Sequence, residues 1–468
     1  MLKFFPALVL LALAASPARA EWPAESVAMG ARDHPKLLQR FGGEVQNPPL
    51  SAYVSAVGAR VVAASDRADE TWRFTVLDSP AVNAFALPGG YIYVTRGLLA
   101  LANSESQLAA VLAHEVTHVL EYHVEARQAA QSDALVEGAL SALVTGLFGG
   151  GEDRLGSAVR SGVETTLGQI GSYSQEQEFA ADAGGITLLQ AAGYRPAAQA
   201  EFLAAMAANT ALAGQRARGL PEFADHPAPE ERQLRALALA GSADGERGVE
   251  PYLAAIEGMK FGQNQRGGII RGQVFLHPQL GFQFEAAAGL RIQNAARQIN
   301  ILGPGRATLV MTGGTGTSDL LGSLQAWAAQ VPRAERQGRD LSNMQRLEIN
   351  GMEAATGTVN LRQRGRRTTL RLTVIRFNGG LIRFAGTTPR GDEAAAGLQW
   401  QTVQSFGPLV ADPATLAQHY LAIHYVAAGE PVEALVPEGM SAAEFRVLNQ
   451  LGPQQELQVG RAVKTVSF

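Results

Sequence analysis

The chain has 468 residues, a formal net charge of −4 at pH 7 and no cysteine. This length is enough for about two to four domains with well-buried cores. The nearly balanced charge argues against a general affinity for nucleic acid. The lack of cysteine excludes disulfides, thiolate metal ligands and a lipid-modified cysteine anchor.

The first 20 residues have the pattern of a secretory signal peptide. Lys3 is followed by an apolar run from Phe4 to Ala15, and Ala18 and Ala20 form an A-x-A cleavage site. Because the apolar run is too short for a comfortable membrane span, we expect it to be removed, leaving a mature chain that begins at residue 21.

Helices and a small sheet are predicted next. Residues 25–66 have helical periodicity, and residues 72–77 predict a strand. Residues 85–94 predict a pair of strands, because Pro88-Gly89-Gly90 interrupts them with a turn.

The helix predicted over residues 107–125 contains His114, Glu115 and His118 in the pattern HExxH. Residues four apart share a helical face, so the two imidazoles can bind one Zn²⁺ at about 2.0–2.1 Å each. Glu115 lies about 100° around the helix, where it can reach a water on the metal rather than the metal itself. Zinc lowers the pKa of such a water to about 7, and the carboxylate can take its proton as it attacks a peptide carbonyl.

The surroundings of this pattern favour a metal. Ser104 followed by Gln107 is a capping-box signature, and the helix is apolar on most sides. A buried pair of histidines needs polar partners, which a shared metal would supply. His123 lies nine residues after His114, on the opposite side of the predicted helix, and is interpreted as a surface or otherwise satisfied histidine.

Residues 133–170 predict a glycine-rich helical pair. Its most apolar stretch, 135–148, carries Glu137 and ends in three glycines, so it is unsuited to a membrane span. We interpret this stretch as a lid over the cleft, with contact to a membrane surface as the alternative.

A third ligand is predicted downstream. Ser174 and Gln177 repeat the helix-start signature, and Glu178 and Asp182 share one face of the helix that follows. Glu178 can bind the metal while Asp182 accepts the outer N–H of a ligand histidine. Glu176 is a competing ligand, but no acid stands four residues after it.

Two glycines, Gly184 and Gly185, stand inside the same predicted helix. Each costs about 1 kcal/mol relative to alanine in a helix. That cost is explained if this helix must approach another one closely.

These motifs are similar to those of a known protease group. The segments that carry the similarity are HEVTH at 114–118, EFAAD at 178–182, HPAPEER at 226–232 and NAFALPGGYIYVTRG at 83–97. They resemble the gluzincin endopeptidases, a group that includes the CAAX prenyl endopeptidase, the HtpX membrane proteases and the soluble periplasmic BepA-type proteases. The resemblance covers about half of the chain. It implies a zincin-like fold, zinc ligands His114, His118 and Glu178, and the general base Glu115.

The same resemblance implies how a substrate is bound. An edge strand within 83–95 would receive an extended peptide by strand addition, with contacts from Asn83, Ala84, Phe85, Pro88, Gly89 and Gly90. His226 matches a His-Pro loop beside the cleft. There it donates to the oxyanion, occupies the open zinc position at rest, or is a loop histidine in water. Arg232 would support that loop.

The second half of the chain has a different pattern. After a polar, glycine-rich linker near 241–250, alternating apolar residues predict strands, and a turn signal at Asn378-Gly379-Gly380 joins two of them. Helices are predicted near 318–331 and 393–403. Arginines gather nearby, at Arg362, Arg364, Arg366, Arg367 and Arg371. They are interpreted as a solvated hairpin tip, with contact to an anionic envelope polymer or lipid headgroup as the alternative.

The last fifty or so residues resemble a LysM module, a small βααβ fold that binds N-acetylglucosamine polymers. Leu448-Asn449 and the run from Gly460 to Lys464 match its pattern. The usual Gly-Asp of its first turn is Gly429-Glu430 here.

We therefore expect an α+β chain in four parts. These are a signal peptide at 1–20, an α-rich zincin-like metalloprotease domain at 21–245, an α+β antiparallel-sheet accessory domain at 250–405 and a LysM-like module at 418–468. The expected function is that of a metalloendopeptidase with one Zn²⁺ per chain, secreted to the periplasm of a Gram-negative bacterium and peripheral to the membrane or cell wall.

Its expected substrates are misfolded or unassembled envelope proteins. The C-terminal half is expected to contact peptidoglycan or outer-membrane components, and nucleic acid is not an expected partner. The alternative is a chaperone-like or scaffold protein that binds unfolded envelope proteins with little proteolysis. Such a protein would have no use for Glu115.

Overall fold

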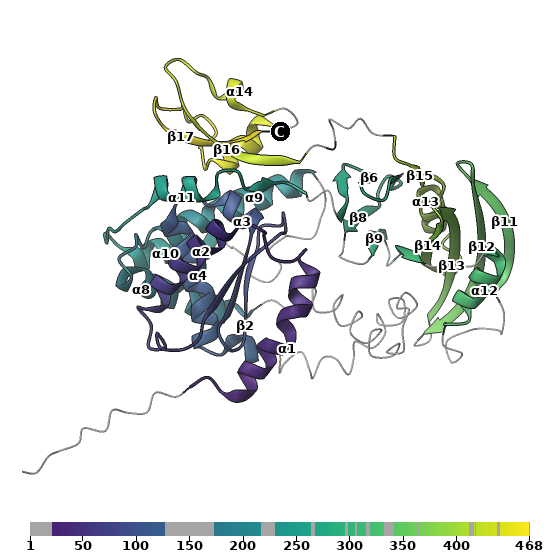
Figure 1. Ribbon diagram of the computed structural model, residues 1–468, viewed down its shortest axis with the longest axis horizontal. Helices are drawn as coiled ribbons and strands as arrows, with labels where there is room; N and C mark the ends of the chain where they lie inside the picture. The colour runs from purple at the N-terminus through teal and green to yellow at the C-terminus, as the bar shows by residue number, and fades with distance from the viewer. Residues whose placement is uncertain are drawn as a thin grey trace, which may run out of the picture.

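The computed structural model describes residues 21–126, 173–216, 230–263, 267–294, 298–304, 307–314, 319–331, 341–363, 366–410, 416, 418–437 and 440–467. The expected signal peptide, the proposed lid at 135–148 and His226 lie outside these residues. The first part of the chain is α-rich with a small sheet, and the second part contains antiparallel sheets, so the predicted mixed fold is confirmed (Figure 1). In the described part of the chain, no helix combines the length and apolar character that a membrane span needs.

Helices surround a three-stranded sheet in the first part. Its elements are α1 (Ala24–Arg40), α2 (Pro48–Val62), β1 (Arg73–Leu77), β2 (Ala84–Leu87), β3 (Tyr91–Thr95), α3 (Arg96–Leu101), α4 (Glu105–Leu120), α8 (Gln175–Ala191), α9 (Ala198–Arg216) and α10 (Glu230–Ala240). The strand order is β1-β3-β2, with β1 parallel and β2 antiparallel to β3, so β2 is an edge strand.

The turn between β2 and β3 explains two glycines. Gly89 and Gly90 have φ angles of 78° and 84°, which favour glycine. A Cβ on Gly89 would lie 2.9 Å from Cα of Val27 in α1, and one on Gly90 would lie 2.5 Å from the carbonyl oxygen of Thr71. The turn therefore needs glycine both for its backbone and for its packing.

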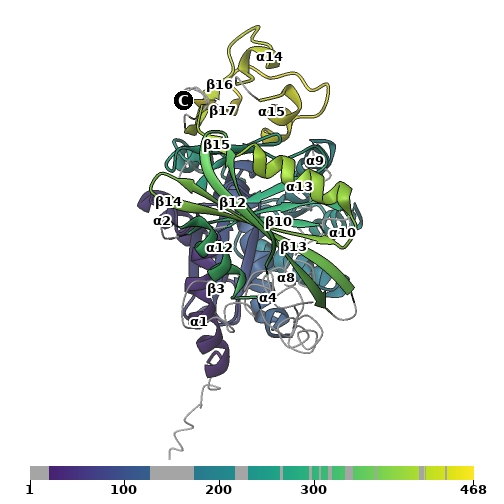
Figure 2. The ribbon, with the colours of Figure 1, turned by 90° about the vertical axis from the view of Figure 1, so that its right-hand side faces the viewer.

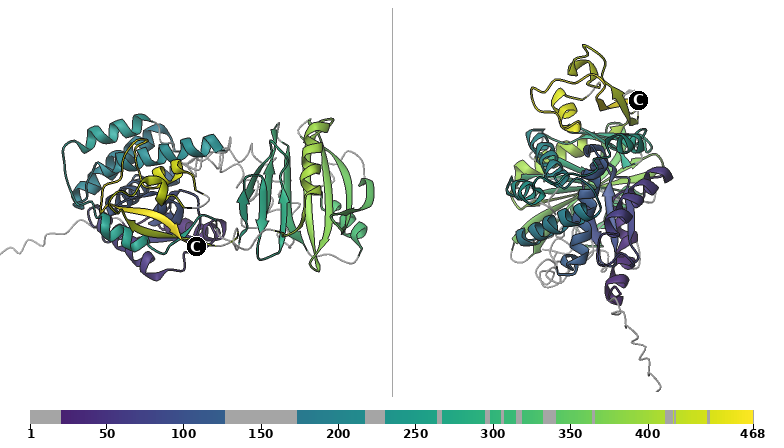
Figure 3. Two further views of the ribbon diagram at one scale, coloured as in Figure 1. Left: turned by 90° about the horizontal axis from the view of Figure 1, so that it is seen from above. Right: turned by 90° about the vertical axis from the view of Figure 1, so that its left-hand side faces the viewer.

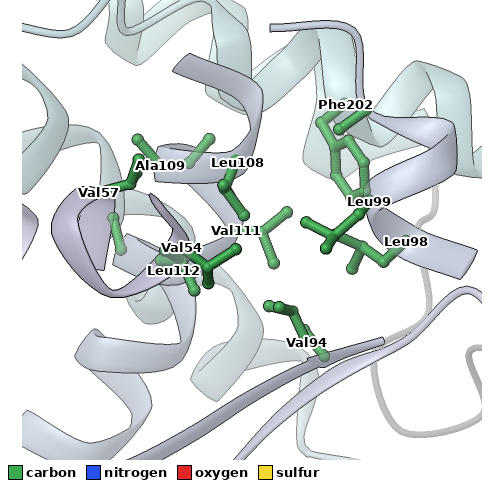
Figure 4. Close-up of a cluster of buried hydrophobic side chains, with 14 of the residues drawn as sticks. Val54, Val57, Val94, Leu98, Leu99, Leu108, Ala109, Val111, Leu112 and Phe202 are labelled. Carbon is green, nitrogen blue, oxygen red and sulfur yellow. The ribbon is translucent and has the colours of Figure 1, made fainter. Parts of the chain in front are cut away.

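Helix α4 runs through the centre of the first core. Apolar residues of α2, β3, α3 and α9 pack around its residues Leu108, Val111 and Leu112, as Figure 4 shows. Ser104 caps α4 by accepting from the N–H of Gln107, which is one half of the predicted capping box. The side chain of Gln107 accepts instead from the N–H of Asn103. Because α4 is buried along nearly its whole length, polar groups on it must find partners inside the protein.

Two glycines let α8 pack closely on α4. A Cβ on Gly184 would lie 2.5 Å from Cγ2 of Thr117, and one on Gly185 would lie 3.2 Å from the backbone nitrogen of His114. The predicted close approach is therefore present, and it sets the acidic first turn of α8 beside the histidines of α4.

The zinc-binding pattern lies on a shorter helix than the sequence predicts. Helix α4 ends at Leu120 instead of continuing to Glu125. Tyr122 adopts a left-handed conformation with φ of 54°, which ends the helix, and residues 123–126 form a separate helical turn. The direction of His123 is changed as a result.

The second part contains a seven-stranded and a four-stranded antiparallel sheet. Their strands are β5 (Ile269–Arg271), β6 (Val274–His277), β7 (Phe282–Glu285), β8 (Arg291–Asn294), β9 (Ile299–Leu302), β10 (Thr308–Gly314), β11 (Ser342–Ile349), β12 (Met352–Gln363), β13 (Arg366–Phe377), β14 (Gly380–Pro389) and β15 (Gly407–Pro408). The larger sheet has the order β11-β12-β13-β14-β10-β9-β8, and the smaller has β15-β7-β6-β5. Helices α12 (Leu320–Ala328) and α13 (Glu393–Gln404) pack on this region, beside the long strands in Figure 2.

The arginine cluster lies at the end of a hairpin. Arg362 and Arg367 form a cross-strand pair of β12 and β13, and both are exposed. Arg371 is half-buried, with its guanidinium 5.1 Å from the ring centroid of Trp400. The solvated hairpin tip is the interpretation that these positions favour.

The C-terminal segment returns to the first part of the chain (Figure 3). Its elements, in the order strand, helix, helix, strand, are β16 (His419–Tyr425), α14 (Val432–Leu435), α15 (Ala442–Leu448) and β17 (Ala462–Ser467). Strand β16 pairs with β17 and also with β4 (Lys260–Phe261), which follows α11 (Val249–Ile256). The βααβ order agrees with the expected module, whose likeness to LysM stays a prediction.

A buried lysine joins this segment to the start of α4. Lys464 is fully buried, and its ammonium donates to the carbonyls of Ala100 and Ala102 at the end of α3. Gln450 donates to the carbonyl of Leu101 over 3.0 Å. These contacts satisfy the last carbonyls of α3, which directly precedes α4.

We predict that Lys464→Met destabilises the protein by about 1–3 kcal/mol, because buried carbonyls of α3 lose their donor. Urea unfolding followed by circular dichroism measures the effect. Lys36→Met, the same substitution at an exposed lysine, is the control and should change little. Wild-type unfolding of Lys464→Met would contradict this assignment.

Candidate metal centre

Three buried side chains converge where α4 meets α8. Each of His114, His118 and Glu178 offers one ligand atom, and these atoms lie within 4.8 Å of one another. The two Nε2 atoms are 3.1 Å apart. Oε1 of Glu178 lies 3.5 Å from Nε2 of His118, and Oε2 lies 3.6 Å from Nε2 of His114.

This donor set fits a divalent metal. Bonds of about 2.0–2.1 Å in a tetrahedron place neighbouring ligand atoms about 3.3 Å apart. The two Nε2 atoms lie close to that distance from each other, and each of them lies close to it from one of the two oxygens of Glu178. Two imidazoles and one carboxylate also leave the fourth position for a reacting molecule.

The outer nitrogen of each histidine has a partner. Nδ1 of His114 lies 3.0 Å from Oδ1 of Asp182, and Nδ1 of His118 lies 3.0 Å from Nδ1 of His123. The ring of His118 also stacks on Tyr173, with centroids 3.8 Å apart. Both ligand rings are therefore held with Nε2 directed into the cluster.

Arg232 of α10 neutralises the carboxylates beside the cluster. Its Nη1 lies 2.5 Å from Oε2 of Glu178, and its Nε and Nη2 donate to the two oxygens of Asp182 over 2.7 Å. Gln199 donates to Asp182 over 2.8 Å as well. Burial by itself raises the pKa of Asp182, but the hydrogen bonds from Arg232 and His114 outweigh it and lower this pKa to about 2. Asp182 therefore stays anionic as the acceptor for His114.

Glu115 is buried on α4 directly after His114 and is not a member of the ligand cluster. Burial lowers the pKa of the Arg232 guanidinium, but nearby carboxylates raise it overall. Asp182 has the largest raising effect, and Glu178 and Glu115 add to it.

The structure separates the two candidate acids of α8. Glu178 is buried in the cluster, whereas Glu176 is exposed. Hydrogen bonds from its own backbone and from Ser174 lower the pKa of Glu176. Of the two acids, Glu178 is therefore the one that lies with the histidines in the cluster.

Two other residues have partners that the sequence does not indicate. Arg232, predicted to support the loop of His226, binds Glu178 and Asp182, while His226 itself lies outside the described residues. His123, predicted on the far side of the helix, faces His118 because the helix ends before it. No local signal marks the left-handed Tyr122 that redirects it.

The predicted substrate-binding residues form the strand β2 and its turn. Ala84 and Phe85 begin this edge strand, and Asn83 precedes it with its carbonyl accepting from the N–H of Thr95 over 3.0 Å. All three are buried. Pro88, Gly89 and Gly90 form the turn packed on α1, and that packing accounts for the glycines without a substrate.

Comparisons with known proteins agree with this geometry. Residues 48–239 match peptidase family M48. The chain is 29% identical over 212 residues to the beta-barrel assembly-enhancing protease of Escherichia coli K12, which covers 43% of this chain and 42% of that protein. It is 33% identical over 184 residues to the mitochondrial metalloendopeptidase OMA1 of Schizosaccharomyces pombe, covering 39% of this chain and 51% of that protein.

The chain thus spans about half the length of these curated relatives or less. Among solved structures, LpqN of Mycobacterium tuberculosis, described as involved in cell envelope biogenesis, matches 27% of this chain and 83% of its own at 13% identity. The TM-score of 0.20 is too low to support a shared fold.

We predict that Glu178→Gln loses most of the bound metal, because a neutral amide is a much weaker ligand than a carboxylate. Elemental analysis of the purified chain should find about one metal ion in the wild type. Glu176→Gln, an exposed position on the same helical turn, is the matched control and should keep the metal. Equal metal loss in both variants would remove Glu178 from the site.

The lowered pKa of Asp182 predicts a pH-dependent stability. Its folded-state pKa of about 2 lies below the unfolded value of 3.8, so the group stabilises the fold above pH 4 and loses this effect as the pH falls toward 2. The stabilisation at stake is about 2 kcal/mol. Urea unfolding of the metal-free chain at pH 2 to 6 measures it. Asp182→Asn should lack this dependence, and an identical pH profile of the two proteins would refute the assignment.

Proposed function

We propose that this chain, whose residues 48–239 match peptidase family M48, is a zinc-dependent endopeptidase. The observation that carries the proposal is the buried set of His114, His118 and Glu178, with Glu115 on the same helix. A protein that only bound unfolded chains would need neither a three-ligand metal set nor a buried acid beside it.

The proposed reaction is hydrolysis of a peptide bond. Zinc, when bound, lowers the pKa of a water and polarises the substrate carbonyl. Glu115 accepts the proton of the attacking water and passes it to the leaving nitrogen. Asp182 keeps the ligand imidazole of His114 in place while the charge on the substrate changes. His226 keeps the two roles inferred from its motif, oxyanion donor or occupant of the open position at rest.

An extended polypeptide along β2 is the proposed substrate geometry. Strand β2 is the edge of its sheet and packs against α4, the helix that carries the metal site. Oδ1 of Asn83 is buried and has no hydrogen-bond partner within the described ranges, so it is suited to accept from a substrate N–H. Main-chain pairing of this kind favours unfolded chains with little sequence preference.

We propose misfolded or unassembled envelope proteins of a Gram-negative periplasm as the substrates. The signal-peptide pattern at 1–20 and the similarity to a protease named for β-barrel assembly support this setting. The C-terminal half, with its accessory domain near 250–405 and LysM-like module at 418–468, is proposed to hold the enzyme close to peptidoglycan or the outer membrane.

We predict that Glu115→Gln keeps the fold and the metal but loses about 10²–10⁴-fold in turnover, because the general base is removed. Cleavage of casein by metal-loaded protein measures the effect. Glu121→Gln, an exposed acid at the end of the same helix, is the matched control and should cleave normally. Normal turnover of metal-loaded Glu115→Gln would exclude the proposed mechanism.

A further inference from the structure

We propose that His123 is a positioning residue for the metal ligand His118, and that the left-handed turn at Tyr122 aims it there. The inference rests on the proposed function, because it assigns a second supporting contact to the same metal centre. The proposal extends the metal centre to His123, to Tyr122 and to the side chains that contact Tyr122.

The geometry fixes the direction of the hydrogen bond. His118 directs Nε2 at His114 and Glu178, so its outer nitrogen is Nδ1, which lies 3.0 Å from Nδ1 of His123. A neutral ligand imidazole that binds through Nε2 carries its proton on Nδ1 and donates it. His123 must therefore accept through Nδ1 and carry its own proton on Nε2.

A regular helix would not bring these two rings together. Five residues along a helix correspond to about 140° of rotation, so His123 would project away from His118. Tyr122, with φ of 54°, ends α4 and turns the chain back. The ring centroids of His118 and His123 consequently lie 5.2 Å apart, at an interplanar angle of 66°.

The unfavourable backbone at Tyr122 is held by distant residues. A side chain larger than glycine or asparagine rarely adopts this conformation unless its surroundings enforce it. Nη2 of Arg67 donates to the hydroxyl of Tyr122 over 2.9 Å, and its guanidinium lies 4.5 Å above the ring of Trp22. The rings of Trp22 and Tyr122 meet edge to face at 6.4 Å.

The charges around the centre explain why the acceptor is a histidine. Glu115, Glu178 and Asp182 are already buried together beside one cation, Arg232. An aspartate in place of His123 would add a fourth carboxylate, with a large desolvation penalty. A neutral imidazole accepts the same hydrogen bond without adding charge.

The test compares the zinc affinity of three variants of the full mature chain. His123→Phe and His123→Leu have no acceptor, whereas His123→Asn places Oδ1 near the position of Nδ1. Competition with a chromophoric chelator measures the zinc dissociation constant. The visible absorption of the cobalt-substituted protein reports the ligand geometry, and thermal unfolding of the metal-free proteins shows whether each variant folds.

We expect the two acceptor-free variants to bind zinc about 10–100-fold more weakly, with altered cobalt bands, and His123→Asn to restore most of the affinity. Wild-type affinity in both acceptor-free variants would overturn the inference. So would equal weakening in all three, which would show that only the volume of the ring matters. A wild-type chain that binds no zinc would overturn the proposed function as well, whereas normal zinc binding and cleavage in His123→Phe would overturn the inference alone.

Discussion

The close packing of α8 on α4 is the constraint on which the rest of the site depends. Gly184 and Gly185 leave room for Thr117 and the backbone of His114, and a Cβ at Gly184 would overlap the side chain of Thr117. This spacing sets Glu178, about two turns before the glycines, against both histidines. It also sets Asp182, less than one turn before the glycines, against the outer nitrogen of His114. Two residues without side chains thus determine where a ligand and its supporting acid lie.

The buried acids at the junction of α4 and α8 concentrate negative charge that needs to be neutralised. Three carboxylates and two imidazoles lie in a region almost closed to water, and unpaired charges there would be strongly destabilising. Arg232 neutralises part of this negative charge by pairing with both Glu178 and Asp182. A divalent metal would neutralise the remainder. The arrangement also keeps Asp182 ionised, which is the state in which it can hold a neutral ligand imidazole.

Local patterns in the sequence predict the parts of the site that local geometry determines. The spacing of His114 and His118, the serine caps and the glycine pair follow from helical periodicity, and each is present as expected. The end of α4 could not be predicted in this way, because nothing in Glu121 or Tyr122 marks a left-handed residue. The side chain of Tyr122 contacts Arg67 and Trp22, which are distant in sequence, so the contact of His123 depends on tertiary structure that local patterns do not reveal.

The start of α4 is also contacted by residues that are distant in sequence. Gln107 in its first turn exchanges hydrogen bonds with Gln450, the N–H of Glu105 donates to the carbonyl of Gly248, and Lys464 satisfies the carbonyls just before it. The glycine-rich stretch near 241–250, which the composition marks as a linker, is therefore hydrogen-bonded at Gly248 to the start of α4. The helix that carries the metal ligands is thus contacted at its start by Gly248, Gln450 and Lys464, and the residue after its end, Tyr122, is contacted by Trp22 and Arg67. Segments that never contact the metal can in this way determine how well its ligands are oriented.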